Sequence, residues 1–181
     1  MNNILLISED YIKTNSGLND NIWGNYLLPA IRETQDIGLQ SIIGSALYGS
    51  ILSKVADGSI RDEGNSAYKT LLDDHIQVCL MYGTIVSLIP LIGVKLANLG
   101  TVISNDEHIT NLSQSERDLV ASRYTHLADF YGRRMQEWLL ANSADFPELD
   151  ECACDTMRAN LRSAATTGLW LGGIRGERII G

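Results

Sequence analysis

The sequence predicts a mainly α-helical fold: a helical bundle around a long central apolar helix, with a helix-poor C-terminal tail and space for one short strand or hairpin. Three observations lead to this prediction. Residues 76–94 contain no Asp, Glu, Lys or Arg. A capping box opens a second long helix at Ser113. Beyond Asn142, acidic residues and glycines replace the helical pattern.

The central stretch, residues 66–99, carries apolar side chains around almost its whole circumference when read as a helix. A helix of this kind is either a membrane span or the axis of a helical core. A span needs roughly 20 strongly apolar residues, and Gly83 and Pro90 interrupt this stretch. We therefore expect a buried central helix that bends at Pro90, where the missing N–H and the crowded carbonyl of Val86 disturb the helix. A membrane span at 76–94 is the alternative.

Four shorter segments before this stretch also read as helical. Pro29 lies inside the second of them and predicts a kink or a break there. Gly44 is expected to end the third, and Gly58 follows the fourth as a C-terminal glycine. The four segments begin at Ser8, at Asn19 or Asp20, at Asp36 and at Ser45.

The capping box places Ser113 and Glu116 so that each side chain satisfies a free backbone N–H of the first helical turn. This helix is expected to run to about Asn142 and to pack against the central helix. Between the two helices, residues 101–103 read as a short strand that needs a partner. The apolar stripe of the second helix comprises Val120, Tyr124, Leu127, Tyr131, Met135 and Trp138.

We expect residues 1–146 to form a helical domain and residues 147–181 to form an acidic linker and an apolar C-terminal tail. The tail sets large apolar side chains between glycines at 167–173 and adds arginines after them. Such a terminus either folds back on its own bundle or docks on a neighbouring subunit by strand addition. The candidate subunit-interface residues are Leu169, Trp170, Leu171, Ile174, Arg175 and Arg178.

Composition narrows the class of partner. The net charge of -8 and the sequence pI of about 4.8 argue against a nucleic-acid-binding face, which would be basic, and favour a protein partner. Cys79, Cys152 and Cys154 do not make a disulfide framework, as expected for a reducing cytoplasm. The apolar run at 4–7 has no basic lead or cleavage site, so we expect no signal peptide.

The sequence carries no motif that predicts an enzyme. It lacks a phosphate-binding loop ending in Lys-Ser/Thr and a Gly-x-Ser-x-Gly elbow. Cys152 and Cys154 alone make an incomplete metal site, and His75, His108 and His126 are scattered along the chain. We therefore expect no catalytic residue, no cofactor and no metal.

Several segments form packing and turn patterns without a catalytic signature. They are Ile42–Tyr48 (IIGSALY), Tyr68–Ile76 (YKTLLDDHI), Asn98–Val102 (NLGTV), Phe130–Met135 (FYGRRM) continuing through Trp138, Leu139 and Asn142, and Phe146–Glu148 (FPE). Together they resemble one known class of protein, the head-tail connector (adaptor) proteins of tailed bacteriophages and prophages of gut bacteria. The resemblance extends roughly from Ile37 to Gly173.

The resemblance implies a homo-oligomeric ring, twelve-fold, beneath the portal in the virion neck, assembled in the host cytoplasm without a membrane. The ring would contact the portal protein and tail or stopper proteins, and DNA would pass through it without specific binding. A negative wall suits such a passage, because it repels phosphate. Ring closure requires two different patches to meet, and the apolar tail is a candidate patch. The alternatives are a small membrane-associated protein and a cytoplasmic helical protein of enzymatic or regulatory role.

Overall fold

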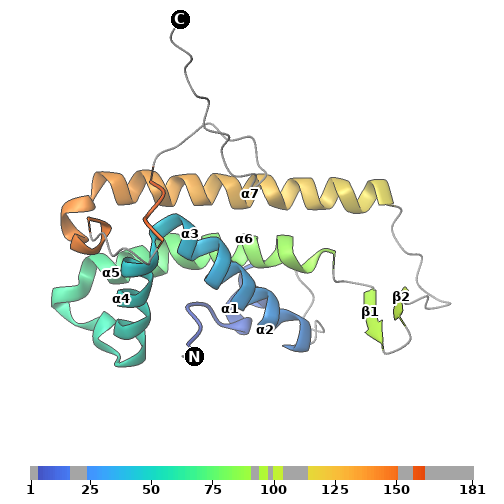
Figure 1. Cartoon of the computed structure of the whole chain (residues 1–181), viewed down its shortest axis with the longest axis horizontal. Helices are drawn as coiled ribbons and strands as arrows, with labels where there is room; N and C mark the ends of the chain where they lie inside the picture. The colour runs from blue at the N-terminus through green and yellow to red at the C-terminus, as the bar shows by residue number, and fades with distance from the viewer. Residues whose placement is uncertain are drawn as a thin grey trace, which may run out of the picture.

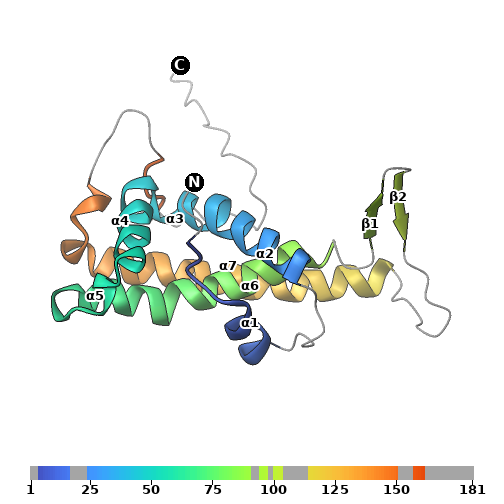
Figure 2. The ribbon, with the colours of Figure 1, turned by 90° about the horizontal axis from the view of Figure 1, so that it is seen from below.

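The computed structural model describes residues 4–16, 24–90, 94–97, 100–103, 114–150 and 157–161. Helices make up most of these residues, so the predicted mainly α-helical bundle is confirmed. The two longest helical segments lie side by side along the long axis, and shorter helices pack on one flank (Figures 1 and 2). The bounds are α1 Glu9–Asn15, α2 Gly24–Glu33, η1 Thr34–Leu39, α3 Gln40–Ile43, α4 Ser45–Ala56, η2 Ser59–Arg61, η3 Glu63–Asn65, α5 Ser66–Thr70, η4 Leu71–Ile76, α6 Gln77–Leu88, β1 Val94–Ala97, β2 Gly100–Ile103, α7 Gln114–Ala141, η5 Ser143–Asp145 and η6 Pro147–Leu149.

The N-terminal helix begins as predicted, because the Ser8 hydroxyl accepts a hydrogen bond from the Tyr11 N–H at 3.1 Å. A kink or a break was predicted at Pro29, and the break is not found, because α2 continues through Pro29 to Glu33. The helices α2 and α3 follow one another through the π-helical turn η1, and this segment ends at Gly44 as expected. Leu27 and Ile31 on α2 are fully buried, so packing of α2 outweighs the hydrogen bond that exposed Pro29 removes.

The central helix comprises α5, the π-helical turn η4 and α6, which run on without interruption. Leu80, Ile85 and Leu88 are buried, so the predicted central buried helix is confirmed. Its predicted extent is wrong, because the helix ends at Leu88 and has no bend at Pro90. Proline lacks the N–H that another turn would need. Among the described residues, no helix is long and apolar enough to cross a membrane.

A two-stranded antiparallel ribbon follows the central helix. Strand β1 pairs with β2 so that Val94 lies opposite Ile103 and Ala97 opposite Gly100. The strand predicted at 101–103 is therefore present, and its partner comes from residues that the apolar pattern assigned to the central helix. Val94 and Leu96 suit a strand as well as a helix, so periodicity alone does not separate the two structures.

Helix α7 has the predicted bounds to within one residue and runs antiparallel to the central helix (Figure 1). Its C-terminal half closes the core, since Met135 and Leu139 are fully buried. The predicted apolar stripe is less buried toward the N-terminus of α7, where Val120 is 39% exposed. After α7 the chain turns back, and the buried Phe146 ring packs edge-on against Tyr68 at 5.0 Å between ring centroids.

Candidate assembly surface

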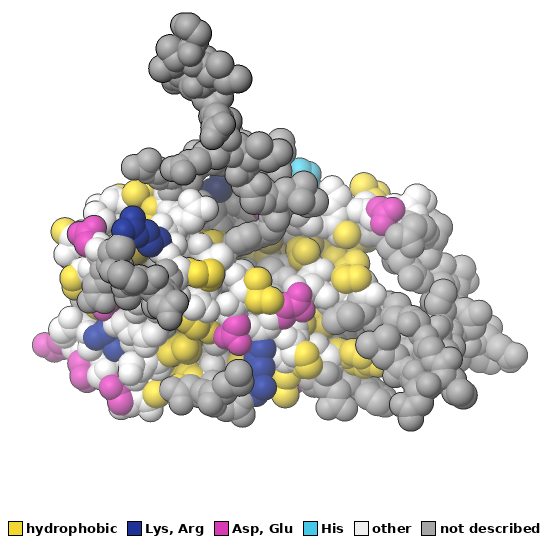
Figure 3. Space-filling model, viewed as in Figure 1, with side chains coloured by type: hydrophobic (Ala, Val, Ile, Leu, Met, Phe, Trp, Pro, Cys, Tyr) yellow, Lys and Arg dark blue, Asp and Glu magenta, His cyan; other side chains and the backbone are white. Residues whose placement is uncertain are grey.

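Large apolar side chains remain on the surface of a molecule whose core is otherwise well filled. Figure 3 shows hydrophobic side chains gathered between α7 and α2, toward the end of the central helix. Contiguous exposed apolar surface commonly marks a contact with another protein. The large hydrophobic residues exposed within the described part are Tyr26, Leu28, Ile37, Leu119, Val120, Phe130, Leu140 and Met157.

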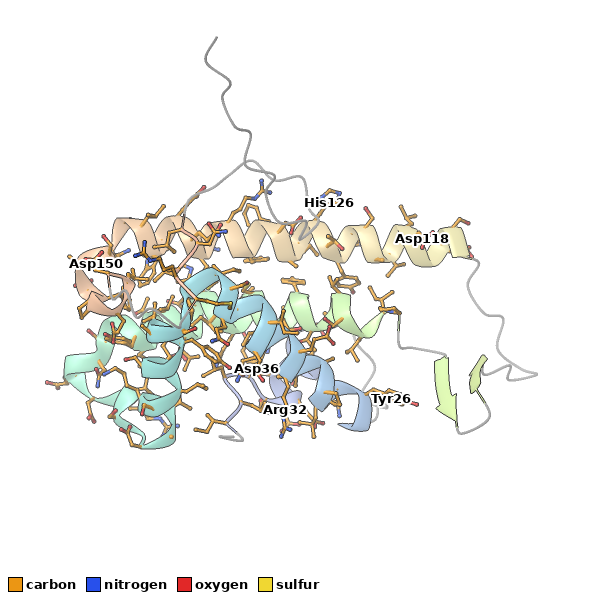
Figure 4. The ribbon with its side chains drawn as sticks, viewed as in Figure 1. Tyr26, Arg32, Asp36, Asp118, His126 and Asp150 are labelled. Carbon is orange, nitrogen blue, oxygen red and sulfur yellow. The ribbon has the colours of Figure 1, made fainter. Side chains whose placement is uncertain are left out.

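The outer face of α7, defined here by Leu119, Arg123, His126 and Phe130, points away from the core. Figure 4 shows His126 projecting from the side of α7 opposite the central helix. Leu119 is 72% exposed and Phe130 is 54% exposed. The two residues lie three helical turns apart on one side of the helix, about 17 Å along its axis. Both are exposed apolar anchors, and the Phe130 ring meets the neighbouring Tyr131 ring edge-on at 5.2 Å between ring centroids.

A surface hollow of about 300 Å³ adjoins Phe130. Its lining consists of Phe130, Arg133, Arg134 and Glu137, all on α7. The hollow therefore combines an aromatic ring, two guanidinium groups and one carboxylate. This set suits an aromatic side chain with charged neighbours, because arginine stacks on aromatic faces.

A second exposed apolar group lies on the α2 flank. Ile37 is 65% exposed in the π-helical turn η1, and Leu28 is exposed on α2. Tyr26 extends from the start of α2 on the side of the β-ribbon (Figure 4). These residues belong to a different face from the outer face of α7, so the subunit carries two distinct apolar surfaces.

The segment 157–161 is clipped onto the turn between α3 and α4 by main-chain hydrogen bonds. The Ser45 N–H donates to the Met157 carbonyl at 2.8 Å, and the Asn160 N–H donates to the Ile42 carbonyl at 2.8 Å. Gln136 Nε2 on α7 donates to the Asn160 carbonyl at 2.7 Å. This clip, residues 157–161, fixes the point from which the chain continues toward its C-terminus.

Gly44 makes the clip possible. Its backbone has a φ of +81°, and a Cβ at this position would lie 2.6 Å from the Ala159 amide nitrogen. Any other residue would therefore meet both backbone strain and the docked segment. The predicted role of Gly44 as a helix stop is confirmed, but its second role in docking the distant segment 157–161 has no signal in the local sequence.

Glu148 anchors the turn that follows α7. Its carboxylate accepts hydrogen bonds from the Tyr68 hydroxyl at 2.8 Å and from Ser50 Oγ at 2.6 Å. Burial, followed by the hydrogen bond to Glu148, raises the pKa of Tyr68 to about 12, so the hydroxyl remains a donor at neutral pH. The predicted boundary between residues 1–146 and 147–181 stays a prediction, and Glu148 contacts the helical body across it.

A buried polar network fixes the N-terminal segment. Gln35 is 2% exposed, accepts from the Leu6 N–H at 2.9 Å, and donates to the Tyr48 hydroxyl at 3.0 Å. The Tyr48 hydroxyl donates in turn to Asp36, and burial together with this bond raises the pKa of Tyr48 to about 12. Gln35 and Asp36 both lie in the π-helical turn η1, and both hydrogen-bond the Tyr48 hydroxyl.

None of the histidines within the described residues lies in a metal site. His75 stacks on Trp138 with 4.7 Å between ring centroids, and His126 stands on the outer face of α7. In that part of the chain, no group of three or more His, Cys, Asp or Glu side chains is placed to hold a metal ion. His108, Cys152 and Cys154 lie outside it.

The six candidate interface residues of the tail also lie outside the described residues, so their assignment stays a prediction. They are Leu169, Trp170, Leu171, Ile174, Arg175 and Arg178. Sequence reasoning missed the outer face of α7, although the apolar residues Leu119 and Phe130 fall off the predicted stripe and were a readable signal.

A wider hollow, of about 980 Å³, lies between the N-terminal segment, the end of α4 and the central helix. Arg61 and Lys69 line it together with Glu9, Asp57 and Asp73. Lys69 is already paired with Asp73 at 2.8 Å, and Asp57 accepts from the Ser59 N–H. Glu9 pairs with Lys13 at 3.9 Å, so three of these five charged side chains are in ion pairs and Asp57 binds a backbone N–H.

The described residues form a helical bundle that leaves large apolar side chains exposed on α7 and on the α2 flank. Residues 39–158 match a family model described as a family of unknown function, DUF6712. Because the match covers more than half of the chain, the protein belongs to this family. No curated protein and no solved structure matches the chain. The matched region extends from the helix before Gly44 to the clip that docks on it.

Proposed function

We propose that this protein is a structural virion protein, a head-tail connector (adaptor) subunit that forms a ring beneath the portal and lines the DNA passage between capsid and tail. The observation that carries the proposal is the outer face of α7, where Leu119 and Phe130 remain exposed on a helix whose other side closes the core. A subunit of a ring needs such a surface, because its stability in the assembly depends on contacts with other copies.

The segments that resemble the connector family support the proposal by their place in the fold. Residues 42–48 form the α3–α4 turn at Gly44, and residues 68–76 contain the π-helical turn of the central helix. Residues 130–135 lie on α7 and include Phe130 of the outer face. The segments thus lie at the α3–α4 junction, in the central helix and on α7, and a likeness confined to such packing and turn positions fits a structural subunit.

Charge supports the same function. The net charge of -8 gives an assembled ring a strongly negative character. A negative wall repels DNA phosphates and so lets DNA pass without specific binding. In this proposal the partners are further copies of the chain, twelve in number by the resemblance, together with the portal protein and tail or stopper proteins. The ring would form in the host cytoplasm and remain in the virion neck, with no role for a cofactor or a membrane.

Electron microscopy of the purified protein tests the proposal. The protein is imaged alone and after mixing with the portal protein encoded in the same genome, and size-exclusion chromatography is run on both samples. We expect discrete rings, or a portal complex that carries a ring of this protein on one face. A protein that elutes as a monomer in both samples and leaves the portal particles unchanged contradicts the proposal.

A further inference from the structure

We propose that the outer face of α7 receives the apolar tail segment, residues 169–174, of a second copy of this chain. This inference rests on the proposed ring function, which requires two different patches to meet at each subunit boundary. The tail and the outer face of α7 would be these two patches. Docking of the tail on its own α7 would occupy both and leave no such contact for ring closure.

The clip determines where the tail starts. Hydrogen bonds from Ser45, Gln136 and Asn160 hold residues 157–161 at the junction of α3, α4 and α7. The remaining chain from Leu161 to Leu169 spans at most about 27 Å when fully extended. Leu169 therefore lies within that distance of the clip, which itself contacts α7 through Gln136.

The acceptor surface matches the chemistry of the tail. Leu119 and Phe130 are exposed apolar anchors about 17 Å apart along one side of α7. An extended tail sets Leu169 and Ile174 about the same distance apart, with Trp170 and Leu171 next to Leu169. The hollow beside Phe130 contains Arg133, Arg134 and Glu137.

A tryptophan ring gains from stacking on a guanidinium group, and the carboxylate of the hollow suits the arginines that follow in the tail. Tryptophan and arginine are also the residues most often found at the energetic centre of protein interfaces. We therefore place Trp170 of one copy in the Phe130 hollow of the next.

A mixing experiment with two complementary variants tests this arrangement. The first variant is the chain ended after Thr167, which lacks the tail segment and retains every contact described above. The second is the full chain with Leu119→Ser and Phe130→Ser, which retains the tail and loses the acceptor anchors. Both substitutions fall on positions that are more than half exposed, and circular dichroism checks that the variant, in which Phe130 no longer contacts Tyr131, remains folded. The matched control carries Leu28→Ser and Ile37→Ser, exposed apolar residues outside the outer face of α7.

Sedimentation velocity of each variant alone and of an equimolar mixture gives the readout. We expect each of the two variants alone to self-associate at least about tenfold more weakly than the full chain. We expect the mixture to form a one-to-one heterodimer, because one intact tail meets one intact outer face. The control variant should self-associate like the full chain.

Two results overturn the inference. One is a truncated chain that assembles as well as the full chain, which would make the tail dispensable. The other is a mixture that stays monomeric. If hydrogen exchange on the outer face of α7 is then faster in the truncated chain than in the full chain, the tail docks on its own α7.

Different results reject the tail contact and the proposed connector function. Portal binding by the full chain with no heterodimer in the mixture rejects only the tail contact. A heterodimer without any portal binding rejects the connector function and leaves the tail contact standing.

Discussion

His75 occupies an unusual place for an ionisable side chain, because it lies inside the helical core. It is 7% exposed in the π-helical turn η4 and stacks on the indole of Trp138. Burial lowers the pKa of its imidazole, the positive charge of Arg134 lowers it further, and Asp74 opposes the shift. The neutral ring is therefore the form that the folded protein accommodates, and His75 packs against Trp138.

This environment makes stability depend on pH. Below about pH 6.5 the unfolded chain binds a proton at His75 that the folded protein resists, so the free energy of unfolding should fall as pH decreases through this range. Above that pH the ring is neutral in both states and has no such effect. Urea unfolding at about pH 7.5 and about pH 5.5 measures the difference, and His75→Gln should reduce it. An unchanged difference in the variant would assign the pH dependence to other groups.

At the scale of elements, α7 performs two tasks along its length. Its C-terminal half packs Met135 and Leu139 into the core, while its outer face and its N-terminal turns carry exposed apolar residues. Because apolar residues lie on both sides of α7, its apolar stripe is weakly defined. An apolar residue on α7 is therefore either a folding residue or a surface residue according to its side of the helix.

Two neighbouring leucines test this division. Leu139 is 0% exposed and Leu140 is 50% exposed. Leu139→Ala should lower the free energy of unfolding by about 3 kcal/mol, because it leaves a cavity in the core. Leu140→Ala should change it by less than about 0.5 kcal/mol. Chemical denaturation of both variants measures the two values, and equal losses would contradict the orientation of α7.

At the scale of the whole molecule, the clip joins parts of the chain that lie far apart in sequence. Residues 157–161 add no helix, yet their main-chain bonds to Ile42 and Ser45 connect the end of the described chain to the α3–α4 turn. The contact depends on the absence of a side chain at Gly44. Main-chain hydrogen bonds of an extended segment therefore add to helix packing in holding the α3–α4 turn.

Gly44→Ala should release the clip. Gly58→Ala is the control, because Gly58 also has a positive φ but has nothing within 4 Å of the added Cβ. We expect Gly58→Ala to cost about 1 kcal/mol from backbone strain. Gly44→Ala should cost at least about 2 kcal/mol, since its φ and ψ lie in a region that is nearly restricted to glycine.

Hydrogen exchange gives the direct measurement of the clip. The amides of Ser45 and Asn160 should exchange at least about tenfold faster in Gly44→Ala and at an unchanged rate in Gly58→Ala. Retained protection of both amides in Gly44→Ala would show that the segment adjusts to the added methyl group, and that the clip does not depend on this glycine.

Much of the fold was readable from local signals. The cap at Ser8, the stop at Gly44 and the extent of α7 follow from backbone hydrogen-bonding needs that a few neighbouring residues satisfy. The end of the central helix was not readable, because the apolar residues after Leu88 suit either a helix or a strand. The two π-helical turns shift the register of the side chains and escape a simple helical count.

By itself, the sequence determined that this protein is a helical bundle with a central apolar helix, and that the helical pattern ends after α7. These features depend on periodicity and caps, which act over a few residues. Only the tertiary structure decided which apolar residues serve folding and which are left for contact. Leu139 and Phe130 are equally apolar in sequence, and the packing of α7 against the central helix alone buries one and exposes the other. The clip over Gly44 was likewise decided in three dimensions, since it depends on two segments that the chain brings together only after folding.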